Sequence, residues 1–180
     1  MGLTNADIEP LKHMTNLTEL DLGGNEMISD IGSLAGLTNL TELYLWGNEM
    51  ISDIGPLARL TNLTSLILER NQISDISALA GLTNLTSLSL SGSQISDISA
   101  LAGLTDLTEL DLQLNQISDI RVLAGLTNLT ELRLDNTQIS DIRVLAGLTD
   151  LTDLGLSGNE ISQTQVDELR RALMNCEIEY

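Results

Sequence analysis

The sequence has one cysteine, one tryptophan, two tyrosines, two prolines and no phenylalanine among its 180 residues. Because Cys176 has no second cysteine to pair with, the internal disulfides that stabilise many small secreted domains are excluded. No apolar run approaches the roughly 18 residues that span a bilayer. The first residues, Met1 to Asn5, have neither the basic nor the apolar region of a signal peptide. The residues themselves leave the compartment open.

Positive charge is also scarce, with 8 Lys and Arg against 26 Asp and Glu and a formal net charge of -18. Nucleic acids and anionic membranes are bound by clustered Lys and Arg, so the composition argues against both as partners. A basic protein surface or a cation stays open. The simpler interpretation is that the acidic residues keep a leucine-rich surface soluble.

Few residues of the kind that catalysis requires are present. His13 is the only histidine, and neither it nor Cys176 belongs to a recognisable nucleophile–base arrangement. No glycine-rich phosphate loop and no metal-ligand spacing occurs. We therefore expect no enzymatic activity, no cofactor and no metal site.

What the sequence does have is one phrase repeated along most of its length. It reads Leu-Thr-Asn-Leu-Thr-Glu/Ser-Leu-x-Leu-x-x-Asn-x-Ile-Ser-Asp-Ile-x-x-Leu-Ala-Gly. Its central leucines, spaced by 23, 23, 22, 22, 22 and 22 residues, are Leu20, Leu43, Leu66, Leu88, Leu110, Leu132 and Leu154. The first two repeats are longer because Met27 and Met50 are inserted in a turn. A period in the twenties with this pattern is the leucine-rich-repeat signature.

Each repeat predicts one strand and one return segment. The alternation of Leu20, Asp21 and Leu22 predicts a short, half-buried strand, and Asn25 then turns the chain. Ser93 and Thr137 replace that asparagine with shorter side chains that can still form hydrogen bonds. In the return segment, an aspartate at each Ser-Asp-Ile can cap one helical turn. Capping accounts for these aspartates without a cation, although a ladder of cation sites is the alternative.

One repeat cannot bury its own leucines, but stacked repeats can. We therefore predict an α/β repeat solenoid: a curved leucine-rich-repeat fold with a concave parallel sheet of about seven to eight strands. Short helical or 3-10 turns are expected on the convex side. The expected single domain comprises an N-terminal half-repeat or cap at 1–14, seven repeats at 15–162, and a C-terminal cap helix and edge strand at 163–180. A monomer is favoured, and a dimer through the exposed strand edge stays open.

The phrases Leu-Thr-Asn-Leu-Thr and Asn-Gln-Ile-Ser-Asp-Ile, clearest at residues 60–76, resemble the 22-residue repeats of internalins, which are bacterial surface and secreted proteins. The resemblance covers residues 7–162 and implies a concave face that binds protein partners. We expect three departures from that family: no helical N-terminal cap, no trailing immunoglobulin-like or anchoring segment, and few aromatics on the concave face. Intracellular phosphatase regulators share this repeat class, so an intracellular location stays open.

The repeats differ mainly at the exposed strand positions. Tyr44 and Trp46 share one strand, and Ile67 is expected beside Tyr44 on the next. Exposed Trp, Tyr and Arg often dominate binding energy, and the repeat has no folding reason to place a Trp there. The predicted partner-binding residues are Tyr44, Trp46, Ile67, Glu69 and Arg70, with a second candidate surface at Asp111, Leu114 and Arg133. The alternative is a structural, consensus-like or engineered scaffold with no dedicated ligand.

Overall fold

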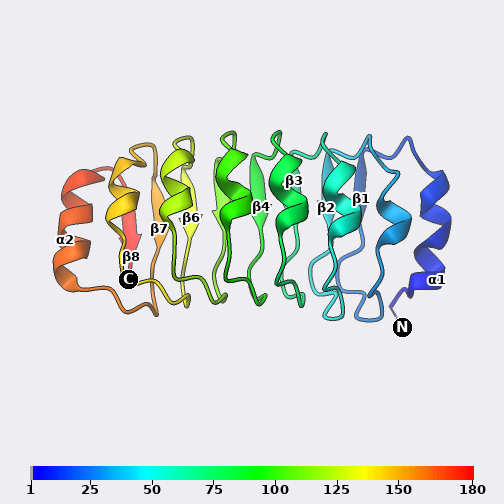
Figure 1. Cartoon of the computed structure of the whole chain (residues 1–180), viewed down its shortest axis with the longest axis horizontal. Helices are drawn as coiled ribbons and strands as arrows, with labels where there is room; N and C mark the ends of the chain where they lie inside the picture. Colours follow the sequence, from blue (N-terminus) through cyan, green and yellow to red (C-terminus); the bar gives the residue numbers. More distant parts are fainter. Residues whose placement is uncertain (1) are drawn as a thin grey trace.

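The computed structural model describes residues 2–180 as one parallel sheet backed by a layer of short helical turns (Figure 1). The sheet has eight three-residue strands in sequential order from β1 to β8. They are β1 (Glu19–Asp21), β2 (Glu42–Tyr44), β3 (Ser65–Ile67), β4 (Ser87–Ser89), β5 (Glu109–Asp111), β6 (Glu131–Arg133), β7 (Asp153–Gly155) and β8 (Glu177–Glu179). The predicted leucine-rich-repeat solenoid is confirmed.

The return segments are 3-10 turns: η2 (Gly32–Leu34), η3 (Gly55–Arg59), η4 (Ser77–Gly81), η5 (Ser99–Gly103), η6 (Arg121–Gly125) and η7 (Arg143–Gly147). The aspartate before each turn accepts a hydrogen bond from the backbone N–H two residues later, as Asp75 Oδ1 does from Ser77 at 2.8 Å. These bonds to Ser77 lower the pKa of Asp75. The capping role predicted for this aspartate is confirmed.

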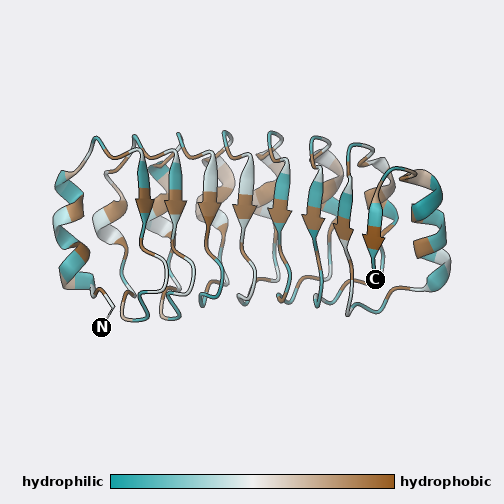
Figure 2. Cartoon of the chain, turned by 180° about the vertical axis from the view of Figure 1, so that it is seen from behind, coloured by the Kyte–Doolittle hydropathy of each residue, from teal (hydrophilic) through white to brown (hydrophobic). Residues whose placement is uncertain are grey.

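The core lies between the sheet and the 3-10 turns. Register between neighbouring strands pairs equivalent repeat positions, so that Leu43 lies between Leu20 and Leu66. Leu43 and Leu45 are fully buried, as are their counterparts in the following repeats. Burying each leucine contributes about 1.5–3 kcal/mol. Figure 2 shows the strands side by side on the opposite face, pointing the same way.

An asparagine after each strand ties neighbouring repeats together. Asn48 Nδ2 donates to Leu45 O at 2.9 Å and to Leu22 O of the preceding repeat at 3.0 Å. Asn71, Asn115 and Asn159 make the equivalent pairs of bonds. Thr137 Oγ1 bonds to Leu134 O at 2.8 Å, as expected for its shorter side chain. The same expectation is wrong for Ser93, whose buried hydroxyl reaches no partner.

The two inserted methionines change the turn that follows their strands. Ile28 N–H and Ile51 N–H each donate to the carbonyl three residues earlier at 2.9 Å, which closes a tight turn and leaves Met27 and Met50 exposed. In a shorter repeat the equivalent N–H, that of Ile95, donates instead to Asn115 Oδ1 at 3.0 Å. The insertion therefore costs the solenoid a bond between neighbouring repeats.

Both ends of the sheet are flanked by helical segments. At the N-terminal end, α1 (Asn5–Ile8) continues into η1 (Glu9–His13), and Ile8 is buried in the core. At the other end, α2 (Gln163–Ala172) begins after Ser162 and packs Val166 and Leu169 against the last repeat. The helix and edge strand expected there are both present. Within residues 2–180, no helix has the length and apolarity that crossing a bilayer requires.

Candidate binding surface on the sheet

The face of the sheet turned away from the 3-10 turns is called the open face. It carries the first and third residue of each strand and the residue two positions further on. Pairing in register places Tyr44 directly beside Ile67, as predicted. Trp46, Arg70 and Leu114 are exposed, whereas the other predicted site residues are half-buried: Tyr44, Ile67, Glu69, Asp111 and Arg133.

Trp46 leans toward β1 and rests on two glycines. A Cβ atom on Gly23 would lie 2.2 Å from the indole Nε1 and Cε2 atoms, and one on Gly24 would lie 3.4 Å from Cη2. The ring therefore crosses the backbone of Gly23 and Gly24, and it has room because Gly23 lacks a side chain, while Gly24 lies in ordinary contact with it. Despite this support, 46% of Trp46 remains exposed.

Tyr44 bonds to a residue of its own strand. Its hydroxyl donates to Glu42 Oε2 at 2.5 Å. That hydrogen bond is the main reason why the pKa of Tyr44 is raised, with smaller contributions from burial and from the negative charges of Glu42 and Glu19. The neighbourhood of Tyr44 is therefore electronegative, and its hydroxyl stays protonated at neutral pH.

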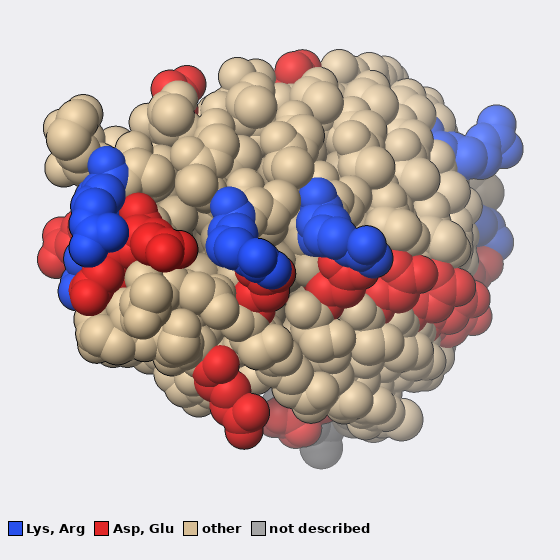
Figure 3. Space-filling view, turned by 60° about the vertical axis from the view of Figure 1, so that its left-hand side comes forward, with Lys and Arg blue, Asp and Glu red and all other residues tan. Residues whose placement is uncertain are grey.

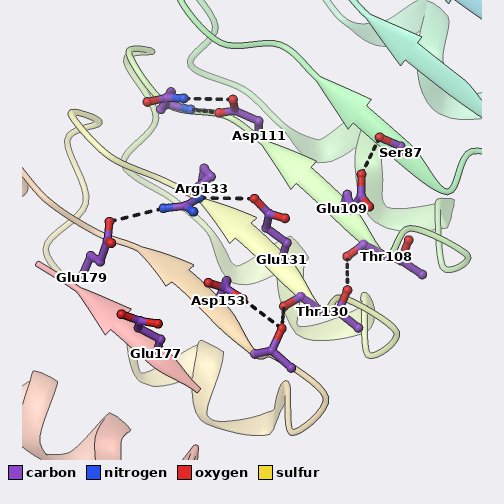
Figure 4. Close-up of polar contacts among 12 residues, drawn as sticks. Ser87, Thr108, Glu109, Asp111, Thr130, Glu131, Arg133, Asp153, Glu177 and Glu179 are labelled. Atoms are coloured by element: carbon purple, nitrogen blue, oxygen red, sulfur yellow. Dashed lines mark hydrogen bonds and ion pairs between the residues drawn. The ribbon is translucent and has the colours of Figure 1, made fainter. Parts of the chain in front are cut away.

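The two predicted patches meet at a hollow of about 170 Å³ over β3 to β6. Ser87 and Ser89 are short residues in columns where most other strands carry larger side chains. Ser89 Oγ donates to Glu69 Oε1 at 2.9 Å. Ser87 Oγ donates to Glu109 Oε2 at 3.0 Å, a contact that Figure 4 shows. Four predicted site residues line this hollow: Ile67, Glu69, Asp111 and Arg133.

The hollow is predominantly acidic. Burial is the main cause that raises the pKa of Asp111, and the charges of Glu69 and Asp135 raise it further. Asp111 accepts hydrogen bonds from the backbone and side chain of Gln113 at 3.0 and 2.9 Å. Arg133 lies between Glu131 and Glu179, 3.5 and 3.4 Å away (Figure 4). Arg133 therefore offsets the negative charge of the carboxylates at only one end of the hollow.

Arg70 and Leu114 share an unusual backbone conformation. In every repeat, the residue that follows the last open-face position (the position of Trp46) has a positive φ. These residues are Gly24, Gly47, Arg70, Gly92, Leu114, Asn136 and Gly158. Glycine adopts this left-handed region freely, whereas a larger residue costs about 1–2 kcal/mol there. Arg70 at φ 52° and Leu114 at φ 57° are therefore held at some cost to folding. Leu114 also remains 55% exposed.

The opposite side, which carries the 3-10 turns, has a band of acidic residues with basic side chains beside part of it (Figure 3). Arg121 Nε lies 2.9 Å from Asp119 Oδ1, and Arg143 Nε lies 2.8 Å from Asp141 Oδ1. Hydrogen bonds from these arginines lower the pKa of each aspartate to about 2. Within residues 2–180, no three His, Cys, Asp or Glu side chains are grouped so as to hold a metal ion.

Three features of the open face were missed from the sequence. The hollow is lined in addition by Ser87, Ser89, Glu109 and Glu131. The support of Trp46 by Gly23, and the left-handed column, were also not predicted. Four glycines among the seven members of that column were the signal that could have revealed it.

Stacked strands joined by 3-10 turns, with asparagines bonding successive repeats, define a leucine-rich-repeat solenoid, a class that generally serves in protein interactions. The family model "Leucine Rich repeats (2 copies)" matches residues 15–59, 38–81, 61–103, 83–125, 105–146 and 127–171. The chain belongs to this family and is of the internalin type, as the solved structures below indicate.

Internalin C2 from Listeria monocytogenes is 38% identical, with a TM-score of 0.92 over 99% of this chain and 76% of that one. An internalin (inlF) of the same species is 36% identical, with a TM-score of 0.75 over 96% and 56%. Leptospira interrogans protein LIC12759, with leucine-rich repeats, is 26% identical, with a TM-score of 0.83 over 96% and 51%. The chain thus spans about half of the latter two. A comparison with curated protein sequences gives no significant match.

Proposed function

We propose that this chain is a protein-binding module that recognises its partner on the open face. The central contact residues are Tyr44, Trp46, Ile67, Glu69 and Arg70. The hollow over β3 to β6 extends this surface to the second patch: Asp111, Leu114 and Arg133. The internalin relationship supports a partner that is a protein, and a location at a bacterial surface or in secreted form.

The support of Trp46 by glycine is the observation that carries the proposal. Gly23 and Trp46 occupy equivalent positions in adjacent repeats, and a Cβ on Gly23 would overlap the ring at 2.2 Å. A large aromatic side chain is thereby held in place while nearly half of it faces solvent. Rigid, exposed aromatics lose little conformational entropy on binding and are enriched among the residues that dominate interface energy.

The strained residues on the same face support the proposal further. Neither Arg70 nor Leu114 improves folding, because glycine is the better residue at a positive φ. Backbone strain held at an exposed position is characteristic of functional surfaces. A scaffold with an inert face, the alternative, has no reason to keep an exposed leucine in that conformation.

The test is affinity capture with four immobilised proteins. The wild type and a Met174→Ala control, altered at an exposed residue outside the open face, should retain the same partner. Tyr44→Ala combined with Trp46→Ala should lose it, with an affinity at least about tenfold lower. Gly23→Ala, which displaces the ring without removing it, should weaken capture as well. All four proteins should first be shown to melt alike.

Retention of the partner by the double variant would contradict the assignment of the binding surface. Capture of no partner by any of the four proteins from cells or media that contain the natural ligand would favour the scaffold alternative.

A further inference from the structure

The outer face of the Trp46 ring is a surface for a positively charged group. One face of the indole covers Gly23 and Gly24, and the exposure of 46% leaves the other side open to solvent. The face of an aromatic ring is electronegative, and tryptophan attracts ammonium and guanidinium groups more strongly than tyrosine or phenylalanine does.

One carboxylate, Asp21, lies two residues from the glycine beneath this ring, and Glu42 and Glu19 lie further along the same two strands, beside Tyr44. Asp21 Oδ1 accepts a hydrogen bond at 2.8 Å from the backbone N–H of Gly23, the glycine beneath the indole. Glu42 holds the Tyr44 hydroxyl at 2.5 Å, and Glu19 adds its charge to the same region. A cation over Trp46 would therefore be attracted by the ring and by nearby negative charges at once.

Among residues 2–180 no ion pair offsets this charge, and the basic side chain on this part of the open face is Arg70, one repeat further on. The stretch from 13 to 58 contains no Lys or Arg and has seven carboxylates: Glu19, Asp21, Glu26, Asp30, Glu42, Glu49 and Asp53. The ion pairs found among residues 2–180 use other carboxylates, those of Glu9, Asp119, Glu131, Asp141 and Glu179. The seven carboxylates of residues 13–58 therefore form no ion pair, which leaves the region around Trp46 predominantly negative.

We propose that the partner recognised by the open face is a protein segment that places a lysine or arginine side chain against the outer face of Trp46. Asp21 and Glu42 attract that side chain, while apolar groups of the same segment cover the adjacent pair of Tyr44 and Ile67. The inference rests on the proposed binding function and specifies the chemistry of the partner. Charge complementarity, together with the supported indole, is its basis.

Trp46 is the only tryptophan, so tryptophan fluorescence, excited selectively over that of Tyr44 and Tyr180, reports on this place alone. The probes are hexa-arginine, hexa-glutamine and hexa-glutamate peptides, each titrated into the full chain at low ionic strength. Hexa-arginine should change the emission of Trp46 in a saturable manner, and added salt should weaken its binding. The other two peptides should leave the emission unchanged.

Two pairs of substitutions separate local from overall charge. Asp21→Asn with Glu42→Gln removes two charges from the strands that carry the ring and Tyr44, while both new side chains can still accept the existing hydrogen bonds. Asp106→Asn with Asp150→Asn removes two charges from exposed turns, where other repeats carry asparagine. Hexa-arginine affinity should fall about tenfold in the first variant and stay within about twofold in the second.

Equal affinity losses in the two variants would overturn the inference, because the attraction would then come from net charge rather than from this location. An unchanged Trp46 emission, or an equal response to hexa-glutamine, would overturn it too. Failure of this inference is distinguishable from failure of the proposed function. A partner lost by the Tyr44→Ala, Trp46→Ala variant but kept at full affinity by Asp21→Asn, Glu42→Gln would leave the binding module intact and refute only the cationic contact.

Discussion

Replacing Ser93 by asparagine should stabilise the protein, because it restores the asparagine that most repeats carry at this position. The Ser93 hydroxyl is buried without a hydrogen-bond partner. At the next repeat, Asn115 Nδ2 donates to Leu90 O and Leu112 O at 3.0 Å each, and its Oδ1 accepts from Ile95 N–H at 3.0 Å. Ser93→Asn places the same amide among Leu68 O, Leu90 O and the N–H of Ile73.

The expected gain follows from those three hydrogen bonds. Each contributes a net 0.5–1.5 kcal/mol as a rough range, and ordering the longer side chain offsets part of the total. We expect the free energy of unfolding to rise by about 2 kcal/mol. For a chain of this length, that gain corresponds to an increase in Tm of about 4–8 °C.

Urea and thermal unfolding, followed by circular dichroism, measure the change. Asn115→Ser is the matched reverse substitution. It should lower stability by a similar amount, because it removes, one repeat further on, hydrogen bonds equivalent to those that Ser93→Asn creates. Amide hydrogen exchange should slow most in the repeats on either side of residue 93. If Ser93→Asn left stability unchanged while Asn115→Ser lowered it by about 2 kcal/mol, the two positions would not be equivalent and the reasoning would be refuted.

Three other changes test separate features. Asparagines at the position of Asp106 and Asp150 in other repeats donate to a threonine carbonyl of the preceding repeat at 2.8–2.9 Å. Asp106→Asn and Asp150→Asn should therefore each raise the free energy of unfolding by about 1 kcal/mol in urea titrations, and a loss would contradict this. Leu114→Gly should add about 1 kcal/mol by relieving the positive φ, while a marked decrease would show that the side chain contributes more than the strain costs. Because burial raises the pKa of Asp111 in the folded state, its ionised form disfavours folding at neutral pH, and this penalty disappears as the pH falls below its ordinary value of 3.8. Asp111→Asn should thus stabilise the protein by roughly 0.5 kcal/mol at pH 7 and have no such effect near pH 3; a gain that did not depend on pH would disprove the electrostatic explanation.

The fold was predictable because the register of the whole sheet is determined by one repeated pattern. Equivalent leucines such as Leu43 and Leu66 must meet in the core, so the spacing of 22 or 23 residues specifies strands, turns and neighbours together. The column of capping aspartates followed from the same logic, and its hydrogen bonds are present. The buried leucine and the aspartate before the turn both recur at the same place in the repeats, so a single sequence is enough to recognise them.

The candidate surface was predictable only in outline, since it depends on residues that differ between repeats. Pairing of Tyr44 with Ile67 followed from register. The direction of the Trp46 side chain did not, because it depends on the empty space above Gly23 in the preceding repeat. The hollow likewise arises because Ser89 is smaller than its register neighbours Ile67 and Asp111. The repeat pattern does not specify the residue at this variable position.

The sequential order of the strands has a mechanical consequence. Each strand is hydrogen-bonded only to the strands before and after it in the chain, from β1 through to β8. Tension applied between the two ends would therefore act on one coil at a time. Every coil that detaches releases 22 or 23 residues, about 75 Å of extended chain. The molecule should lengthen in a series of nearly equal steps, and the coil containing Ser93, with its unbonded hydroxyl, is where the array is weakest in its interior.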